Sequence, residues 1–419
     1  MREDASARRD GEARPLAGAP WLVAPESRRV LAALTAAGRP ARFVGGCVRD
    51  SLRDPEADPH DLDLATAEPP ERVMALLEAA GIRTVPTGLA HGTVTALAGP
   101  RSFEITTLRR DVETFGRHAR VAYTDDFAED AARRDFTINA MSADPEGRLF
   151  DYFGGREDLH AGRVRFVGRA RDRIREDYLR ILRFFRFFAR FGRPPPDAEA
   201  LEACAAEAAG LDRLSGERIR EELLRLLTAP GAVASLRLMA ETGVLARILP
   251  WPVDTETLAR LMVLVPDADP ILRLAALLRR AEPGEAGAVR LAERLRLSNR
   301  QRERLRLLLT APLPDFRETE TTHRARAWRL GREAYLDLLA LAAALRDVPR
   351  ETFAAVRGAV AAFVPPPFPL RGRDLLALGL SPGPAVGRLL RDLERRWVES
   401  DFRLSREALL ALARRRIGG

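Results

Sequence analysis

Residues suited to redox and zinc chemistry are scarce in this chain. Its 419 residues include two cysteines, Cys47 and Cys204, and five histidines. Neither cysteine lies near a second cysteine or a histidine at zinc-ligand spacing, so a disulfide framework is excluded and a zinc site is not expected. No apolar run reaches the roughly 18 residues that a membrane span requires. We therefore expect a soluble protein with no membrane partner.

Lysine is absent, although the chain is strongly basic. All 68 basic residues are arginine, and 60 acidic residues leave a formal net charge of +8. Clustered positive charge gains free energy on a phosphate backbone through the release of counterions, so a nucleic-acid partner is favoured. Guanidinium groups suit phosphate recognition, but genomic base composition explains the exclusive use of arginine more simply.

The first residues are charged and small and contain proline, with no apolar segment of the kind found in signal peptides. This composition predicts a disordered lead-in over residues 1–24 and indicates a cytoplasmic location. Residues 25–150 then mix strand-like alternation with helical spacing, which predicts a head with a small mixed β-sheet. After Gly155 helical spacing dominates, with proline-rich breaks. We expect an α+β fold in which an all-helical neck, body and tail occupy residues 151–228, 229–364 and 365–419.

A glycine pair, Gly45 and Gly46, follows a short apolar segment and precedes a helix that is predicted to begin at about Cys47. Backbone N–H groups at a helix start face an anion, and glycine allows a triphosphate to approach the chain closely. Arg49 lies on the first helical turn, where it can meet the same triphosphate. The alternatives are an ordinary strand-to-helix turn and an exposed ion pair between Arg49 and Asp50.

Two aspartates, Asp61 and Asp63, alternate with leucines. On a strand both carboxylates project from one face. A short pair of hard oxygen ligands suits Mg²⁺, which keeps several waters and bridges to substrate phosphates. Glu104, on a second apolar strand, is a candidate third carboxylate of a two-metal site for in-line phosphoryl transfer. The alternative is a solvated acidic loop.

Four motifs occur in an order that resembles the class II tRNA nucleotidyltransferase and bacterial poly(A) polymerase superfamily. They are Gly45–Asp50 followed by Asp61–Asp63, then Arg133–Ala140, then Asp151–Leu159, and finally Glu176–Arg183. The resemblance is dense over residues 42–192. It implies a nucleotidyltransferase head whose metal ligands are Asp61 and Asp63, followed by a helical neck, body and tail.

The second of these motifs resembles the family's ribose-recognising segment. Asp135 has the acceptor oxygens needed to bind a ribose 2′-hydroxyl, the group that distinguishes ribonucleotides from deoxyribonucleotides. By resemblance, Arg134 meets the triphosphate and Asn139 belongs to the nucleotide-binding set. Standing alone, the arginines and aspartate would be read as a charge cluster at a helix start.

The fourth motif resembles the family's nucleobase-selecting segment. We expect one helix over residues 176–191, on which Asp177 and Arg180 share a face. A carboxylate beside a guanidinium offers an acceptor and donors that imitate a Watson–Crick edge. Arg183 and Arg186 continue the stripe and are expected to contact the nucleotide or its phosphates. The alternative is surface ion pairing, and the phenylalanines between these residues are expected in the core.

The polar, basic segment over residues 108–119 is expected to form a mobile loop, with Arg109 and Arg110 as candidates for helping the change from cytidine to adenosine addition, as the resemblance implies. A passive surface loop is the alternative.

Taken together, the resemblance implies template-independent addition of C and A nucleotides, from CTP and ATP, to tRNA 3′ ends, with Mg²⁺ as cofactor and the tRNA acceptor region as partner. Rival enzymes are a poly(A) polymerase and an enzyme that adds only A or only C. A rival of another class is an RNA-binding protein without activity. The oligomeric state, monomer or dimer, stays open.

Overall fold

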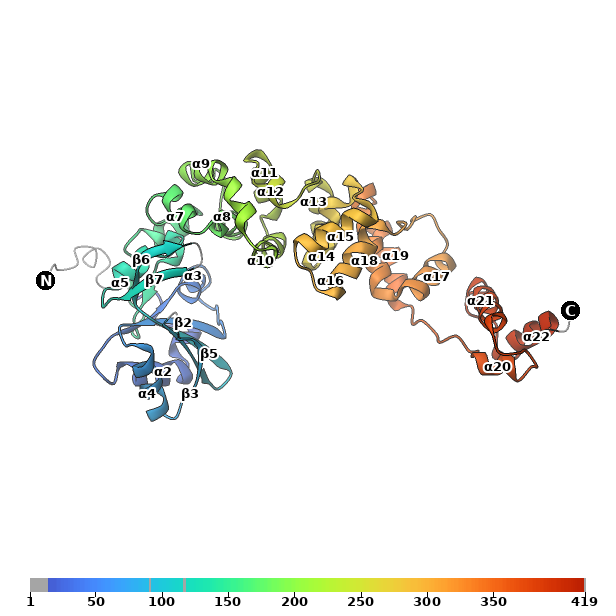
Figure 1. Ribbon diagram of the computed structural model, residues 1–419, viewed down its shortest axis with the longest axis horizontal. Helices are drawn as coiled ribbons and strands as arrows, with labels where there is room; N and C mark the ends of the chain where they lie inside the picture. Colours follow the sequence, from blue (N-terminus) through green and yellow to red (C-terminus); the bar gives the residue numbers. More distant parts are fainter. Residues whose placement is uncertain (1–13, 90–91, 116–117, 418–419) are drawn as a thin grey trace. The chain divides into compact units, whose positions relative to one another are not determined.

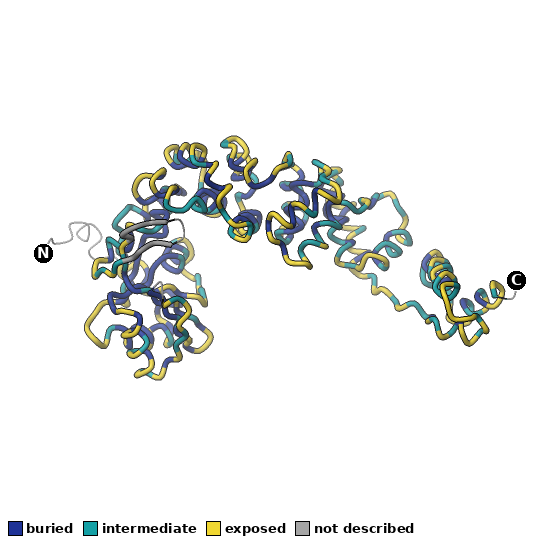
Figure 2. The backbone as a smooth tube through the Cα atoms, in the orientation of Figure 1, coloured by how far each residue is buried: buried dark blue, intermediate teal, exposed yellow. Residues whose placement is uncertain are grey.

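The computed structural model describes residues 14–89, 92–115 and 118–417. The chain divides after Pro250 into two compact units, which are shown in Figure 1. This division does not test the finer boundaries expected between neck, body and tail, which stay predictions. Dark blue segments in Figure 2 mark the buried backbone inside each unit.

The first unit contains a seven-stranded mixed sheet in the order β3-β4-β5-β2-β1-β8-β9. Its central strand β2 pairs parallel with β5 and antiparallel with β1. The bounds of the strands are β1 Ala41–Val44, β2 Asp61–Thr66, β3 Arg83–Gly88, β4 Thr93–Ala98, β5 Arg101–Thr107, β8 Ser142–Ala143 and β9 Leu149–Phe150. The expected α+β head with a mixed sheet is confirmed.

Alternation along β2 gives the sheet one apolar and one polar face. Leu62 and Leu64 are buried with Val30 of helix α2 (Pro25–Thr35) and Leu77 of helix α4 (Pro70–Ala79) in one core cluster. Figure 1 shows both helices against the sheet. Since successive side chains point to opposite faces, the aspartates of β2 project away from these helices.

Part of the predicted lead-in is ordered. Residues 1–13 lie outside the described residues, but Leu16 and Trp21 are buried, and α1 covers Pro20–Val23. The Trp21 ring packs edge-on against Phe43 with 4.7 Å between centroids, and its Nε1–H donates to Ser51 Oγ at 2.6 Å. The expectation of disorder up to residue 24 overlooked this tryptophan, whose large apolar area stabilises the segment on the head.

The segment expected to be a mobile loop is instead a β-hairpin. Strands β6 (Arg109–Phe115) and β7 (His118–Tyr123) pair antiparallel as a separate two-stranded sheet. The segment is polar, but residues 109–123 include two valines, a threonine, a phenylalanine and a tyrosine, which favour extended backbone.

Nine further α-helices among the described residues complete the first unit. They are α3 Gly46–Arg53, α5 Phe127–Ala132, α6 Gly155–Ala161, α7 Ala170–Glu176, α8 Leu179–Phe191, α9 Ala198–Ala206, α10 Gly216–Leu227, α11 Ala232–Glu241 and α12 Val244–Ile248. The single helix expected over 176–191 is wrong, because Asp177 is extended and separates α7 from α8. Its carboxylate accepts from Leu179 N–H at 3.1 Å, a local contact that competes with helical continuation. The phenylalanines of α8 are buried, as expected.

The second unit is all-helical over its described residues, 251–417. Its helices are α13 Thr255–Leu264, α14 Pro270–Leu278, α15 Gly284–Arg294, α16 Asn299–Thr310, α17 Glu320–Leu330, α18 Arg332–Arg346, α19 Arg350–Ala362, α20 Gly372–Leu376, α21 Pro384–Glu399 and α22 Arg406–Ile417. In the described parts of both units, every helix is too short or too polar to cross a membrane.

Truncation of Trp21 to alanine should destabilise the first unit by about 3–5 kcal/mol, the usual cost of removing a buried large aromatic side chain. The measurement is the midpoint of thermal or urea unfolding. Val23→Ala is the matched control, because Val23 lies on the same helix but is 38% exposed. An unchanged midpoint for Trp21→Ala would contradict the packing of this segment on the head.

Candidate active site

The polar face of the sheet carries three acidic residues on two neighbouring strands. The parallel register sets Asp61 opposite Ser102 and Asp63 opposite Glu104. All three carboxylates are exposed, and Asp61 accepts a hydrogen bond from the Ser102 hydroxyl. The sheet therefore brings Asp61, Asp63 and Glu104 together at its surface.

This arrangement disfavours ionisation of Asp63. Partial desolvation by the surrounding protein, together with the neighbouring carboxylates of Glu104 and Asp61, raises the pKa of Asp63 to about 6, although Arg134 opposes the shift. A cation between these groups would relieve the repulsion. Among the side chains that the structure describes, no three metal-ligating residues form a cage. An incomplete set of one or two carboxylates suits a hard divalent cation that keeps waters and binds substrate phosphates.

The glycine pair lies beside these acids, at the end of β1. Gly45 has a φ of 74° and precedes α3 (Gly46–Arg53), a conformation that favours glycine. A Cβ atom at Gly45 would lie 3.4 Å from Arg134 Nη1 and 3.6 Å from Asp63 Oδ2. A larger residue would therefore crowd both an arginine and a carboxylate. Backbone N–H groups at a helix start favour an anion, and here the N–H of Gly45 itself donates to the Met141 carbonyl at 3.4 Å.

Arg49 of α3 is mostly buried. Its Nε pairs with Asp50 Oδ1 at 2.9 Å, and its Nη1 donates to Asn139 Oδ1 at 2.5 Å. The guanidinium also lies 4.3 Å from the centre of the Phe191 ring. The ion pair with Asp50 considered from the sequence does form, but burial and the contact with Asn139 make Arg49 part of a larger network.

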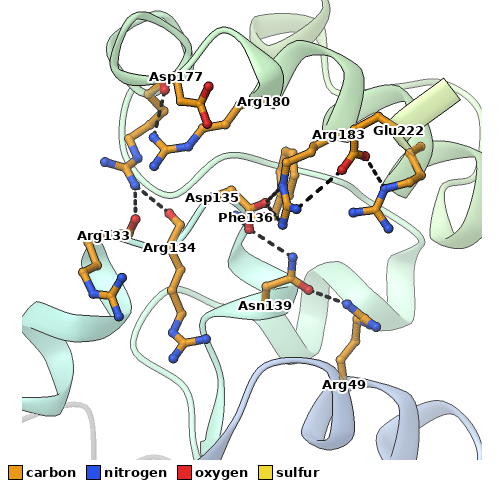
Figure 3. Close-up of polar contacts among 12 residues, drawn as sticks. Arg49, Arg133, Arg134, Asp135, Phe136, Asn139, Asp177, Arg180, Arg183 and Glu222 are labelled. Carbon is orange, nitrogen blue, oxygen red and sulfur yellow. Dashed lines mark hydrogen bonds and ion pairs between the residues drawn. The ribbon is translucent and has the colours of Figure 1, made fainter. Parts of the chain in front are cut away.

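Asp135 is the centre of that network, which Figure 3 traces from Arg49 through Asn139 and Asp135 to Arg183. Asn139 Nδ2 donates to Asp135 Oδ1 at 3.0 Å, and Arg183 Nε donates to Asp135 Oδ2 at 2.7 Å. Burial alone would raise the pKa of Asp135, but the charge of Arg183 and the bond from Asn139 outweigh burial, so this pKa is lowered. Asp135 is thus held as an ionised acceptor.

Arg186 points to a different partner. Its Nε donates to Oε2 of Glu222 at 2.5 Å, and Glu222 Oε1 also lies 3.8 Å from Arg183 Nη1. Glu222 belongs to α10 and is buried. Its carboxylate therefore supports the Arg183 end of the network (Figure 3). Glu222 was not predicted from the sequence, because the spacing of the residues around it does not indicate a buried acid.

The two predicted base-reading residues have separate partners. Asp177 Oδ2 accepts from Arg218 Nη2 at 2.7 Å. Arg180 Nη1 lies 2.5 Å from Glu176 Oε2 and donates to the Arg173 carbonyl at 2.8 Å. Arg218 was also not predicted from the sequence.

These groups surround one pocket of about 450 Å³ in the first unit. Of the residues predicted from the sequence, Asp61, Glu104, Arg109, Arg110 and Arg186 do not line it. The lining consists of Gly45, Gly46, Arg49, Asp63, Arg134, Asp135, Asn139, Asp177, Leu179, Arg180, Arg183, Phe187 and Arg218. A cavity with the Asp63 carboxylate at one end and arginines along its walls is suited to a triphosphate ligand.

Comparisons with known proteins agree with this geometry. Residues 41–165 match the family model described as "Poly A polymerase head domain", and residues 196–252 match "Probable RNA and SrmB- binding site of polymerase A". The chain is 36% identical over 377 residues to "CCA tRNA nucleotidyltransferase 1, mitochondrial" of Mus musculus, which covers 88% of this chain and 85% of the relative. The chain belongs to the CCA tRNA nucleotidyltransferase family.

Further relatives of this nucleotidyltransferase support the assignment. The Danio rerio protein of the same name is 37% identical and covers 88% of this chain and 86% of its own length. Among solved structures, the Bacillus stearothermophilus CCA-adding enzyme in complex with CTP is 28% identical, with a TM-score of 0.77, covering 94% of this chain and 97% of that one.

The cytoplasmic location expected from the sequence is contradicted by these comparisons, because the Mus musculus and Danio rerio relatives are named as mitochondrial proteins. The expectation rested on composition and on the lack of an apolar signal segment. Composition of this kind does not distinguish among compartments that contain tRNA.

Replacing Asp63 with asparagine should stabilise the metal-free protein at pH 8. The pKa of Asp63, about 6, exceeds its ordinary value of 3.8, so the folded state holds this proton more tightly than the unfolded chain, and ionisation costs folding free energy. The gain, roughly 1 kcal/mol after allowance for solvent screening, should be full above pH 6 and vanish towards pH 4.

Thermal unfolding in the presence of a chelator at pH 4 and pH 8 measures this difference. Glu56→Gln, which removes an exposed carboxylate between α3 and β2, is the control and should show no such pH dependence. A lower melting temperature for Asp63→Asn at pH 8 would contradict the proposed repulsion.

Proposed function

We propose that this nucleotidyltransferase adds C, C and A to the 3′ ends of tRNA, using CTP and ATP without a nucleic-acid template and releasing pyrophosphate. The observation that carries the proposal is the single pocket, in which a strand carboxylate, a glycine turn and the base-reading residues of the neck meet. Each has the chemistry required by a different part of a nucleoside triphosphate.

The tRNA 3′-hydroxyl attacks the α-phosphate, and the bond between the α- and β-phosphates breaks. Asp61 and Asp63 are proposed to hold Mg²⁺, which when bound activates the hydroxyl and neutralises the leaving pyrophosphate. Glu104, in register with Asp63, is proposed as the third carboxylate. It would add negative charge where the cation binds.

The arginines and the glycine turn would position the triphosphate. The backbone N–H of Gly46 at the start of α3 would face the phosphates, and Arg134 and Arg49 offer guanidinium donors. Arg134 is held in place by the buried Asp130, 3.3 Å from its Nη2. Fixed donors of this kind orient the reacting phosphate without a reorganisation cost.

Base choice would depend on Asp177 and Arg180. Cytosine and adenine each present an exocyclic amino donor beside a ring-nitrogen acceptor, which a carboxylate and a guanidinium can match. Uracil and guanine place a carbonyl acceptor at the amino position, so an ionised Asp177 would repel them. Arg183 and Asn139 would hold Asp135 as the acceptor for the ribose 2′-hydroxyl. Arg186 does not line the pocket, so it would act indirectly by binding Glu222, which lies 3.8 Å from Arg183.

The helices that do not line the pocket are proposed to bind the acceptor region of tRNA through sequence-independent contacts from arginine to phosphate. Affinity based on such contacts falls steeply with salt.

Asp61→Ala should lower nucleotide addition by roughly a thousandfold, the scale of removing a group that stabilises the transition state electrostatically. The assay uses labelled CTP or ATP with magnesium and tRNA transcripts that end before CCA, after C or after CC. Glu56→Ala is the matched control and should retain activity. Ordered addition of two cytidines and one adenosine supports the proposal. Adenosine alone would indicate a poly(A) or A-adding enzyme, and no incorporation with retained RNA binding would indicate a binding protein.

Asp135→Asn should reduce the preference for CTP over dCTP by about tenfold, since a charge-assisted hydrogen bond contributes about 1.5–3 kcal/mol. The ratio of kcat/KM for the two nucleotides measures this preference. Asp212→Asn, which changes a half-exposed ion pair of the same unit, serves as control. An unchanged ratio would exclude Asp135 as the ribose-reading residue.

A further inference from the structure

Helix α10 contributes a residue to the pocket that the proposed mechanism does not use. Arg218 lies on the first turn of α10, lines the pocket and donates to Oδ2 of Asp177 at 2.7 Å. We propose that Arg218 is a positioning residue that fixes the Asp177 carboxylate and thereby sets the discrimination between bases. This inference rests on the proposed function, because it matters only if Asp177 reads the base.

Asp177 needs such a partner because its backbone gives it little support. It is extended, in the break between α7 and α8, so no helix fixes its side chain. Among the residues that the structure describes, two hydrogen bonds orient the carboxylate: Leu179 N–H donates to Oδ1 at 3.1 Å, and Arg218 donates to Oδ2. An ionised carboxylate has about four acceptor sites, so each oxygen keeps one for a base. Loss of Arg218 would leave one local bond and a carboxylate free to rotate.

Arg180 is positioned by other groups. Glu176 and the Arg173 carbonyl hold its guanidinium, and Arg173 in turn donates to the carbonyls of Arg133 and Arg134. Residues of α7 therefore fix Arg180, the donor half of the proposed base-reading pair, and a residue of α10 fixes Asp177, the acceptor half. Removing Arg218 should disturb only the acceptor half.

The acceptor half is the part that separates cytosine from uracil. The cytosine N4 amino group donates to Asp177, whereas the uracil O4 carbonyl meets its negative charge. A fixed carboxylate both attracts the first and repels the second. A carboxylate that can rotate away loses attraction for CTP and repulsion of UTP together, so selectivity falls more than fold stability.

Helix α10 should keep its place when Arg218 is replaced, because other residues of the helix make its packing contacts. Ile219, Leu223 and Leu226 are buried, and Glu222 still binds Arg186. Arg218 itself is partly exposed, with 25% of its side chain accessible. Arg247 in α12 offers a matched control, because its guanidinium pairs with Asp212 at 3.1 Å outside the pocket.

The experiment measures equilibrium binding of CTP and UTP to the full chain without tRNA, for the wild type, Arg218→Ala, Arg218→Lys and Arg247→Ala. We expect the ratio of UTP to CTP dissociation constants to fall about tenfold in Arg218→Ala, the effect of losing a hydrogen bond to a charged group. Arg218→Lys should restore part of the ratio, because it keeps one charged donor. Arg247→Ala should match the wild type.

A mutant cycle shows whether Arg218 acts through Asp177. In an Asp177→Asn background, Arg218→Ala should cause no further loss of selectivity, because coupled residues are not additive. Equal weakening of CTP and UTP by Arg218→Ala, or additive losses in the cycle, would overturn the positioning role. A wild type without preference for CTP over UTP would refute the base-reading function of Asp177 itself. A wild-type preference that Arg218→Ala retains would refute only the role of Arg218.

Discussion

The ion pair between Asp135 and Arg183 is the contact on which the site depends. It joins the segment between β7 and β8 to helix α8, with Arg183 Nε 2.7 Å from Asp135 Oδ2. Asn139 links Asp135 to Arg49 of the glycine turn, and Glu222 supports Arg183 from α10. A buried charge whose partner is removed costs several kcal/mol. The pair therefore aligns, around one cavity, the parts that are proposed to bind the phosphates, the ribose and the base.

Opposed electrostatic environments lie at the two ends of this cavity. At the sheet, partial desolvation and the neighbouring carboxylates raise the pKa of Asp63, whereas at the helices Arg183 lowers the pKa of Asp135. Asp63 is a carboxylate whose ionised form is disfavoured until a cation binds, and Asp135 is one whose ionised form neighbouring groups already stabilise. Oppositely shifted pKa values of this kind are typical of functional sites. The acidic end favours a cation, and the basic walls favour the phosphates that accompany it.

Local features of the sequence predicted much of this arrangement. Alternation of Asp61 and Asp63 with leucines placed both acids on one face of a strand, and the glycine pair marked a turn that β1 and α3 form. The helical character of the chain after the head follows equally from apolar spacing. The prediction of a continuous helix through Asp177 was wrong. The Leu179 N–H donates a hydrogen bond to the Asp177 side chain, and this local contact competes with helical backbone.

The sequence by itself determined the motifs and the mixed sheet followed by helices, and it predicted one site for Asp63, Asp135 and Asp177, which the structure places around one pocket. Only the tertiary structure decided which partner holds each of them. Strand register sets Glu104 beside Asp63, and the packing of α10 on α8 brings Arg218 to the pocket and Glu222 to Arg183. Charge pairing acts through space and leaves no periodic signal along the chain, so contacts between distant residues appear only in the folded protein.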